Sequence, residues 1–247
     1  MLELKNITKS YGPVKVLNGI SLSFTPGEIM SIVGPSGAGK TTLLQIAGTL
    51  DRPDSGEVLF EGQDLLKLKD KKLSKFRNLN IGFIFQFHQL LPEFSALENV
   101  ALPALIAGKK RKTAFEDAQR WLTELGLAHR LSHKPSELSG GEKQRTAIAR
   151  ALINTPSIIL ADEPTGSLDS RNRDEIKSII SDLREKYNQS FVIVTHDPEI
   201  ADIADRKVLM EDGLIVDQGL SRKVENASEE IITEFNSFIG SRSEDLE

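Results

Sequence analysis

Cysteine is absent from the sequence, which excludes disulfide bonds and thiol chemistry. Long apolar runs are absent too, and none approaches the roughly 18 residues of a membrane-spanning helix. The first residues, 1–5, lack the apolar core of a signal peptide. We therefore expect a protein of a reducing compartment. If it works at a membrane, we expect another chain to cross that membrane.

An excess of positive charge is also missing, because the formal net charge is -5 at pH 7. Proteins that bind nucleic acid usually carry a basic face, so we expect no nucleic-acid partner. The chain has 247 residues, of which 39% are hydrophobic, and this is enough for an ample core. One large α/β domain or two small lobes would suit this size.

What the sequence does contain is a phosphate-binding pattern. Residues 31–42 are SIVGPSGAGKTT, which matches G-x-x-x-x-G-K-[ST]. In this pattern backbone N–H groups surround the β-phosphate, Lys40 reaches the β/γ oxygens, and the Thr41 hydroxyl binds Mg²⁺. An apolar strand pattern precedes the loop and a helix pattern follows it, so a glycine-rich turn without ligand is the weaker alternative. The predicted binding residues are Gly34, Pro35, Ser36, Gly37, Ala38, Gly39, Lys40, Thr41 and Thr42.

Apolar periodicity predicts the elements around this loop. Two early strands alternate apolar and polar residues and predict a small antiparallel sheet, whereas the late strands are apolar on both faces, as in a covered parallel sheet. Strands are predicted at residues 2–7, 20–24, 29–33, 57–62, 81–85, 157–161 and 191–195. Helical patterns are predicted at 65–76, within 87–145 and at 171–187, and a closing hairpin at 208–216.

These elements predict an α/β fold with a mostly parallel sheet core, an N-terminal antiparallel β subdomain and an inserted helical subdomain. The nucleotide-binding core is expected at residues 1–86 and 146–220, and the helical subdomain at 87–145. Residues 221–247 are expected to form a C-terminal helix and tail. Apolar residues 231, 232, 235, 238 and 239 share one stripe of that helix, which would dock on the core or serve a partner.

Two carboxylates follow one of the apolar strands. Asp162 and Glu163 come at its C-terminal end, the edge at which open parallel sheets place their ligands. Asp162 would hold Mg²⁺, and Glu163 would orient and polarise the attacking water. The alternative is that the pair caps a helix.

A second glycine-rich helix start follows at residues 138–144, LSGGEKQ. Its free N–H groups and the Ser139 hydroxyl offer another anion site. The alternative is a serine N-cap with glutamate at the third helical position, the capping-box pattern. Only the first loop has the lysine and the Mg²⁺-binding hydroxyl. Either both helix starts meet one nucleotide, or the second serves the nucleotide of a neighbouring chain.

The set of motifs resembles the ATP-binding cassette (ABC) ATPases over nearly the full length, which implies a P-loop NTPase fold of the ABC type and ATP as the nucleotide. The resemblance implies a head-to-tail homodimer in which Ser139, Gly140 and Gly141 complete the site of the opposing subunit. It also implies that Tyr11 stacks on adenine, for which the alternative is an ordinary turn tyrosine.

Three further roles rest on the same resemblance. Gln86 matches the glutamine that touches Mg²⁺ and the attacking water, and Asp169 matches the residue that couples the two sites across the dimer. His196 matches the switch histidine beside the γ-phosphate, where an imidazole N–H can stabilise developing charge. The alternatives are a surface glutamine, an N-cap and a satisfied loop histidine. With Lys40 and Glu163, Gln86 and His196 form the expected catalytic set.

The segment at residues 86–100 is unusually apolar for a chain that leaves an active-site strand. Part of it would pack the helical subdomain, and the rest would receive separate integral membrane subunits near residues 86–105. Lysines at 67, 69, 71, 72 and 75 and the basic run 109–112 would favour an anionic membrane surface or are simply solvated. We expect a peripheral protein on the cytoplasmic face of the inner membrane.

Residues 85–92, FQFHQLLP, and 96–100, ALENV, resemble most the ATP-binding subunits of bacterial lipoprotein-releasing systems. ATPases of macrolide or peptide exporters and of cell division remain alternatives in the same branch. A soluble ABC protein that acts on ribosomes or DNA usually has two cassettes or a long coiled coil, and neither is present. A small-molecule kinase would not need residues 138–142. The expected function is ATP hydrolysis that powers a membrane complex.

Overall fold

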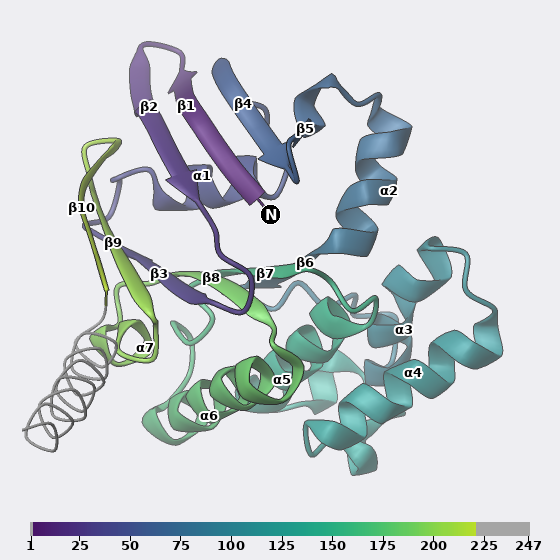
Figure 1. Ribbon diagram of the computed structural model, residues 1–247. Coiled ribbons are helices and arrows are strands. Elements are labelled where there is room, and N and C mark those ends of the chain that lie inside the picture. Colours follow the sequence, from purple (N-terminus) through teal and green to yellow (C-terminus); the bar gives the residue numbers. More distant parts are fainter. Residues whose placement is uncertain (1, 221–247) are drawn as a thin grey trace, which may run out of the picture.

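The computed structural model describes residues 2–220 (Figure 1). The helix and apolar stripe predicted within residues 221–247 lie outside this part. Two sheets and a set of helices make up the described chain. Most of the predicted strands and helices are confirmed. The exceptions are the lysine-rich segment 65–76 and the loop 87–95, whose compositions resemble those of helices.

The larger sheet has six strands in the order β10-β9-β3-β8-β7-β6. The strands from β9 to β6 are parallel, and β10 pairs antiparallel with β9 at one edge. Their bounds are β3 Ile29–Val33, β6 Ile81–Phe85, β7 Ile158–Asp162, β8 Ser190–Val194, β9 Arg206–Glu211 and β10 Leu214–Leu220. The apolar sequences of β7 and β8 are explained by burial on both faces.

The smaller sheet is antiparallel and has the order β2-β1-β4-β5. Its strands are β1 Leu2–Tyr11, β2 Val14–Ser23, β4 Ser55–Phe60 and β5 Gln63–Asp64. Helix α1, Lys40–Ala47, lies between the two sheets in Figure 1, and its apolar side chains join a core with both of them. The predicted α/β architecture with an antiparallel subdomain is therefore confirmed.

The other helices lie on the far side of the large sheet or beside it (Figure 1). They are α2 Asp70–Asn80, α3 Ala96–Ile106, α4 Arg111–Glu124, α5 Gly140–Leu152, α6 Ser170–Tyr187 and α7 Pro198–Ala201. Short 3-10 turns occur at Leu65–Lys67, Ala128–Arg130 and Pro135–Glu137. A second core joins α3, α4, α5 and α6 to the sheet, so the helical part is packed as one unit with it.

The helix predicted at 65–76 is displaced. A 3-10 turn occupies 65–67, where the Asp64 carboxylate accepts from the Leu66 N–H, and α2 begins only at Asp70. Leu68 and Lys69 are extended between them, so the chain breaks its helix at this point. Lysine and leucine favour helix by composition, but they provide no cap that would mark this start.

The helical pattern from Phe87 onward was also too early, because residues 87–95 form a loop. Helix α3 starts after Ser95, whose capping box with Glu98 fixes the first turn. The buried Asn99 side chain holds the loop: its Oδ1 accepts from the Leu91 N–H at 2.8 Å, and its Nδ2 donates to the Leu91 and Phe94 carbonyls. Asn99 thus bonds the backbone of this loop to α3, although several apolar side chains of the loop stay exposed.

Candidate nucleotide-binding site

The parallel strands bring the predicted site residues to one edge of the sheet. In the strand register, Phe85 pairs with Asp162, Asp162 with Val194, and Ile32 with Val194. Gln86, Glu163 and the phosphate loop follow directly after these paired ends, and His196 lies two residues beyond Val194. Because parallel strands end on the same side, four segments distant in sequence converge there.

The phosphate loop is already shaped for an anion. Gly37 and Gly39 have φ of 85° and 94°, a conformation that favours glycine, and Gly39 is the N-cap of α1. A Cβ at Gly34 would lie 2.0 Å from the Met210 carbonyl oxygen, so the strand end admits no side chain there. The buried Lys40 donates from Nζ to the carbonyls of Gly34 and Pro35, at 2.8 and 2.9 Å. Its ammonium therefore spans the loop that a phosphate would enter.

Thr41 and Asp162 lie side by side next to this loop. The Thr41 hydroxyl donates to Oδ1 of Asp162 at 3.1 Å. Burial raises the pKa of the Asp162 carboxyl, and the nearby Glu163 adds to this rise, while the Thr41 hydrogen bond and the charge of Lys40 oppose it. Among residues 2–220 no group of three acidic, histidine or cysteine side chains could hold a metal by itself. Two neighbouring oxygens suit Mg²⁺, which at phosphate sites takes one or two protein ligands and completes its shell with phosphate and water.

Glu163 and His196 form a close pair. The Nδ1 of His196 lies 2.7 Å from Oε1 of Glu163, and because an ionised carboxylate only accepts hydrogen bonds, Nδ1 carries the proton. The Thr195 hydroxyl donates to the other carboxylate oxygen at 3.3 Å. Glu163 also has φ of 47°, which costs about 1–3 kcal/mol for a residue other than glycine. A Glu163 N–H bond to the Val194 carbonyl, at 2.9 Å, helps to hold this backbone in place.

Gln86 joins the same edge. The Ser167 hydroxyl donates to the Gln86 carbonyl at 3.2 Å, and a Cβ at Gly166 would lie 3.0 Å from the Gln86 Nε2. Its side chain therefore lies against the loop that follows Glu163. The resemblance implies a contact of Gln86 with Mg²⁺ and the attacking water, and the structure places Gln86 just after Phe85, the register partner of Asp162.

The turn at Ser139–Gly141 packs against Leu168 and Asn172, at the start of α6. Ser139 and Gly140 are exposed, and a Cβ at Gly141 would meet the Asn172 side chain at 2.0 Å. Asp169, also exposed, caps α6 by accepting from the Asn172 N–H at 2.9 Å. Within residues 2–220, no hydrogen bond or ion pair joins this turn to the phosphate loop of its own chain. The sequence left open whether both helix starts meet one nucleotide or the second serves a neighbouring chain. Within the described part of one chain, the structure shows no bond that joins the two helix starts.

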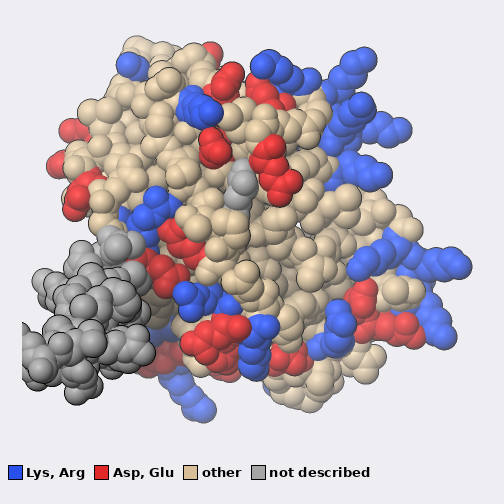
Figure 2. Space-filling view, in the orientation of Figure 1, with Lys and Arg blue, Asp and Glu red and all other residues tan. Residues whose placement is uncertain are grey.

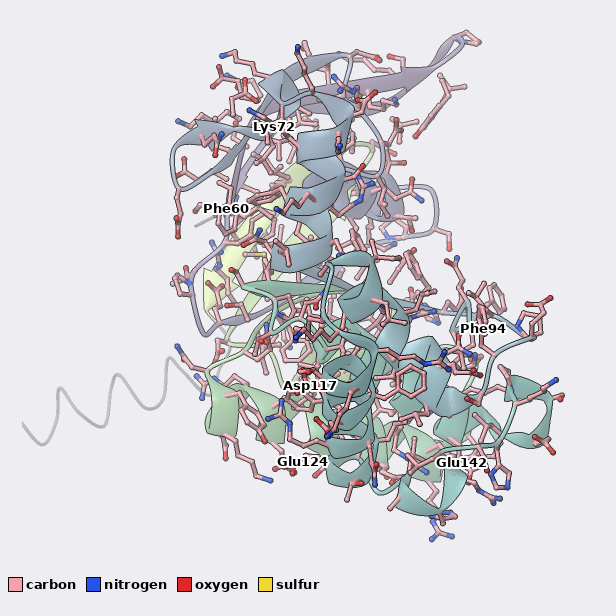
Figure 3. The ribbon with its side chains drawn as sticks, turned by 90° about the vertical axis from the view of Figure 1, so that its right-hand side faces the viewer. Phe60, Lys72, Phe94, Asp117, Glu124 and Glu142 are labelled. Carbon is pink, nitrogen blue, oxygen red and sulfur yellow. The ribbon has the colours of Figure 1, made fainter. Side chains whose placement is uncertain are left out.

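Ser139 and Asp169 are both helix caps in this structure, as the alternative interpretation of each residue predicted. The Ser139 Oγ accepts from the Glu142 N–H, and Glu142 accepts from the Ser139 N–H at 2.8 Å. Figure 3 shows Glu142 low on the helical part of the molecule, far from Lys72 on α2. Capping does not exclude a ligand, because the remaining N–H groups of the first turn still point outward.

Tyr11 is the last residue of β1 and is 48% exposed. Its hydroxyl donates to Oδ2 of Asp51 at 2.7 Å, so the ring is fixed at its polar end. Asp51 follows helix α1, whose first turn carries Lys40, Thr41 and Thr42. Sequence reasoning singled out Tyr11 but missed Asp51, because nothing near Asp51 in the sequence marks it.

Arg150 is a second residue that the sequence did not indicate. Its guanidinium donates to the carbonyls of His88 and Gln89, at 2.8 and 2.7 Å, just after Gln86. Both of these residues have positive φ, 60° and 48°, so Arg150 holds a strained turn. Burial lowers the pKa of Arg150. A long basic side chain on a helix gives no sequence signal for such a contact.

A phosphate loop, a neighbouring threonine–aspartate pair and a glutamate–histidine pair at one strand edge define a nucleoside-triphosphate hydrolase. Comparison with known proteins narrows this class. Residues 17–166 match the family described as ABC transporter. The chain belongs to this family, and its fold is that of the ATP-binding cassette.

Curated relatives are similar over most of the chain. "Lipoprotein-releasing system ATP-binding protein LolD" of Bacteroides thetaiotaomicron is 61% identical over 215 residues, which cover 87% of this chain and 99% of that protein. The protein of the same name from Geobacter metallireducens is 53% identical over 220 residues, covering 87% and 98%.

Two solved structures of the cassette MJ0796 are similar as well. One is a dimeric post-hydrolysis state bound to ADP and Pi, and the other is described as the dimeric structure of a bacterial ABC transporter cassette. Each has a TM-score of 0.83 and 40% identity, and covers 90% of this chain and 99% of the other. None of the helices within residues 2–220 is long and apolar enough to cross a membrane.

The capping box of α5 gives a pH prediction. Hydrogen bonding from the Ser139 N–H, opposed by burial and helped by Arg130, lowers the pKa of Glu142 from 4.5 to about 2. A lowered folded-state pKa stabilises the fold fully above the unfolded value and loses this effect as pH falls. The stability gap between wild type and Glu142→Gln, measured by denaturant unfolding, should be largest near neutral pH and narrow from pH 4.5 toward about 2.

Glu116→Gln is the matched control, since Glu116 is exposed on α4 and its contact with Lys112 spans 4.0 Å. The difference in stability between wild type and Glu116→Gln should be small at every pH, because exposed ion pairs contribute little to the free energy of unfolding. A Glu142→Gln gap that stays constant through the acid range would contradict the assignment.

Proposed function

We propose that the chain is the ATP-hydrolysing subunit of a bacterial ABC complex that releases lipoproteins from the inner membrane and that separate membrane subunits complete. The convergence of the phosphate loop, Asp162, Glu163, His196 and Gln86 at one strand edge carries the hydrolytic part. The names of the relatives, at 61% and 53% identity over nearly their whole length, support lipoprotein release over export of macrolides or peptides.

In the proposed mechanism, the loop N–H groups and Lys40 bind the β- and γ-phosphates of ATP. The Lys40 Nζ now donates to the Gly34 and Pro35 carbonyls, both within 2.9 Å. When ATP binds, it would give up these bonds for bonds to phosphate oxygens. Glu163 orients the attacking water, and Gln86 borders the same space. Thr41, Asp162 and Gln86 would hold Mg²⁺, which neutralises phosphate charge when bound.

His196 supplies the hydrogen bond to the γ-phosphate. Its Nδ1 is taken by Glu163 at 2.7 Å, which leaves Nε2 for the phosphate. To donate to Glu163 and to a phosphate oxygen at the same time, the imidazole has to carry a proton on each nitrogen. The side chain is 71% exposed, so ATP can reach it without rearrangement of the core.

The second half of each site is proposed to come from a second copy of the chain. Ser139, Gly140 and Asp169 are exposed and close together, as residues of an interface must be. The dimeric cassettes among the similar solved structures support this arrangement. Each copy would thus lend its Ser139–Gly141 turn to the nucleotide held by the phosphate loop of the other.

The membrane subunits are proposed to dock in an open cavity of about 670 Å³ between α2 and the helical lobe. It is lined by Leu50, Phe83, Phe85, Gln89, Pro103 and Ile106, together with Arg150. Residues 86–105 therefore supply part of its wall, and Figure 3 looks onto this side, with Lys72 above on α2 and Asp117 below on α4. Apolar walls with aromatic side chains suit a short amphipathic helix of a partner.

The proposed location is the cytoplasmic face of the inner membrane, where the chain would be peripheral. Basic side chains support it: Figure 2 shows Lys and Arg along one side of the molecule, over α2 and the beginning of α4. Of these two elements, α2 lines the cavity through Ser74, Arg77 and Asn78. Lys69, Lys71, Lys72 and Lys75 are exposed, and within the described part of the chain none of them has an ion pair.

Glu163→Gln should trap the dimer. The amide no longer polarises the water, so hydrolysis should fall by about 10²-fold or more while ATP stays bound. Light scattering with ATP and Mg²⁺ should then give twice the monomer mass. Adding Ser139→Ala and Gly140→Glu, at an exposed position where a Cβ would meet only Leu168 at 3.4 Å, should return the trapped chain to the monomer, and an arrested, ATP-loaded chain that never dimerises would contradict the proposal.

His196→Ala should separate hydrolysis from binding. Loss of a hydrogen-bond donor to the developing phosphate charge should lower turnover by about 10²-fold or more, with ATP affinity nearly unchanged. His129→Ala is the control, because His129 is 64% exposed and its contact, to Glu142 at 4.0 Å, is with α5 and not with the phosphate loop or Glu163. Turnover near the wild-type rate in His196→Ala would remove His196 from the mechanism.

Ile106→Glu tests the cavity and the cargo together. Ile106 is 69% exposed and lines the cavity, so a buried carboxylate should prevent docking without harming the isolated chain. We expect the variant to lose its co-purifying membrane subunits and to abolish ATP-dependent release of a lipoprotein from vesicles that contain the complex. Its ATPase activity without partners should stay near wild type.

Val216→Glu is the matched control, since Val216 is 51% exposed on β10 and away from the cavity. If vesicles with the wild-type complex export a macrolide or peptide but release no lipoprotein, the proposed cargo is wrong. Docking that survives Ile106→Glu would move the membrane subunits to another surface.

A further inference from the structure

Tyr11 is held by a small network that the hydrolytic site does not use. Oδ2 of Asp51 accepts from the Tyr11 hydroxyl at 2.7 Å, and Oδ1 accepts from Lys9 Nζ at 2.9 Å. Lys9 Nζ also donates to the Arg52 carbonyl at 2.6 Å and lies 5.1 Å from the centroid of the Tyr11 ring. One carboxylate therefore fixes the hydroxyl of the ring, and one ammonium covers part of its surface.

These contacts are better protected than an ordinary surface ion pair. The Lys9 and Asp51 side chains are 11% and 30% exposed. The hydrogen bond to Asp51 raises the pKa of Lys9 and that of the Tyr11 hydroxyl. Burial opposes ionisation of Asp51, but the bonds from Lys9, Tyr11 and the Arg52 N–H outweigh it and lower the pKa of Asp51. The network is therefore complete at neutral pH.

The network also ties the ring to the phosphate loop. The Leu50 and Asp51 N–H groups donate to the Gln45 carbonyl, at 2.8 and 3.3 Å, so Asp51 is fixed to the end of α1. At its other end α1 begins with Lys40 and Thr41. Strand β1 fixes the backbone of Tyr11, and the Asp51 contact fixes the polar end of its ring relative to α1, the helix that starts at the phosphate loop.

We propose that Asp51 and Lys9 are positioning residues that hold the Tyr11 ring in the orientation in which its free face stacks on the adenine of ATP. The inference rests on the proposed function, ATP binding, and on the adenine-stacking role that the family resemblance implies for Tyr11. A ring that is already fixed loses little conformational freedom when the base stacks on it, so the affinity for adenine nucleotides rises. The phosphate contacts do not depend on the network.

The test compares two probes on the full chain with Mg²⁺: ATP and inorganic tripolyphosphate, which has no base. Tyr11→Phe keeps the ring and removes the hydroxyl, and it should weaken ATP binding about three- to tenfold while leaving tripolyphosphate binding unchanged. Asp51→Ala should act in the same way, as should Lys9→Met. The Tyr11→Phe/Asp51→Ala double variant should bind ATP no more weakly than Asp51→Ala, because both changes break one contact.

Tyr187→Phe is the matched control. Tyr187 is the other of the two tyrosines, is 49% exposed, and donates its hydroxyl to Glu124 at 3.3 Å on a different part of the molecule. Its loss should change the affinity for neither probe.

Tyr11→Leu separates the two proposals, because it removes the ring itself and should weaken ATP binding by about tenfold or more. If Tyr11→Leu binds ATP like wild type, the role of Tyr11 falls and the network with it. If Tyr11→Leu is weak but Tyr11→Phe and Asp51→Ala are normal, only the positioning role is overturned. Equal losses for ATP and tripolyphosphate in Asp51→Ala would show that Asp51 merely supports α1, which also overturns the inference.

Discussion

The common carboxyl edge of the parallel strands is the constraint on which the site depends. Phe85, Asp162 and Val194 are register partners across β6, β7 and β8, and Ile32 of β3 pairs with Val194. A strand that slipped by one residue would turn its buried side chains to the opposite face. In β7, Ile158–Asp162, such a slip toward the interior would draw the Asp162 carboxylate into the buried part of the sheet, which is costly, so the groups that follow the strand stay in register.

Within this frame the charged groups already have partners before a nucleotide arrives. Lys40 is bonded to loop carbonyls, Thr41 to Asp162, and Glu163 to His196 and Thr195. Buried or half-buried charges without partners would be costly, so these bonds keep the open site from collapsing. ATP binding then exchanges hydrogen bonds rather than creating them from solvated groups, and the positive φ at Glu163 marks where the backbone is held against its own preference.

The proposed assembly places its remaining contacts on two separate surfaces. The exposed turn at Ser139 and the cap at Asp169 lie together and face a second copy, whereas the cavity lined by Phe85 and Ile106 faces the membrane subunits. Arg150 lines that cavity and also holds the carbonyls just beyond Gln86. The proposed docking surface and the strand that ends at the site are therefore joined by one side chain.

Local patterns in the sequence were enough to predict the phosphate loop, the capping box at Ser139 and the strands that end at the site, because each involves residues that are neighbours in the chain. The predicted helix start near Asp70 was displaced because nothing local marks the extended Leu68. The start at Ala96 does carry a local signal, the Ser95–Glu98 capping box, but the sequence interpretation extended the helical pattern back to Phe87.

The sequence by itself determined which chemical groups are present and which strand or helix each one follows, because apolar periodicity and capping act over a few residues. Only the tertiary structure decided that Asp51 bonds to Tyr11, 40 residues away, and that Arg150 bonds to Gln89, 61 residues away. Such contacts join side chains that have no pattern in common, and they form only when the packed core brings their elements together.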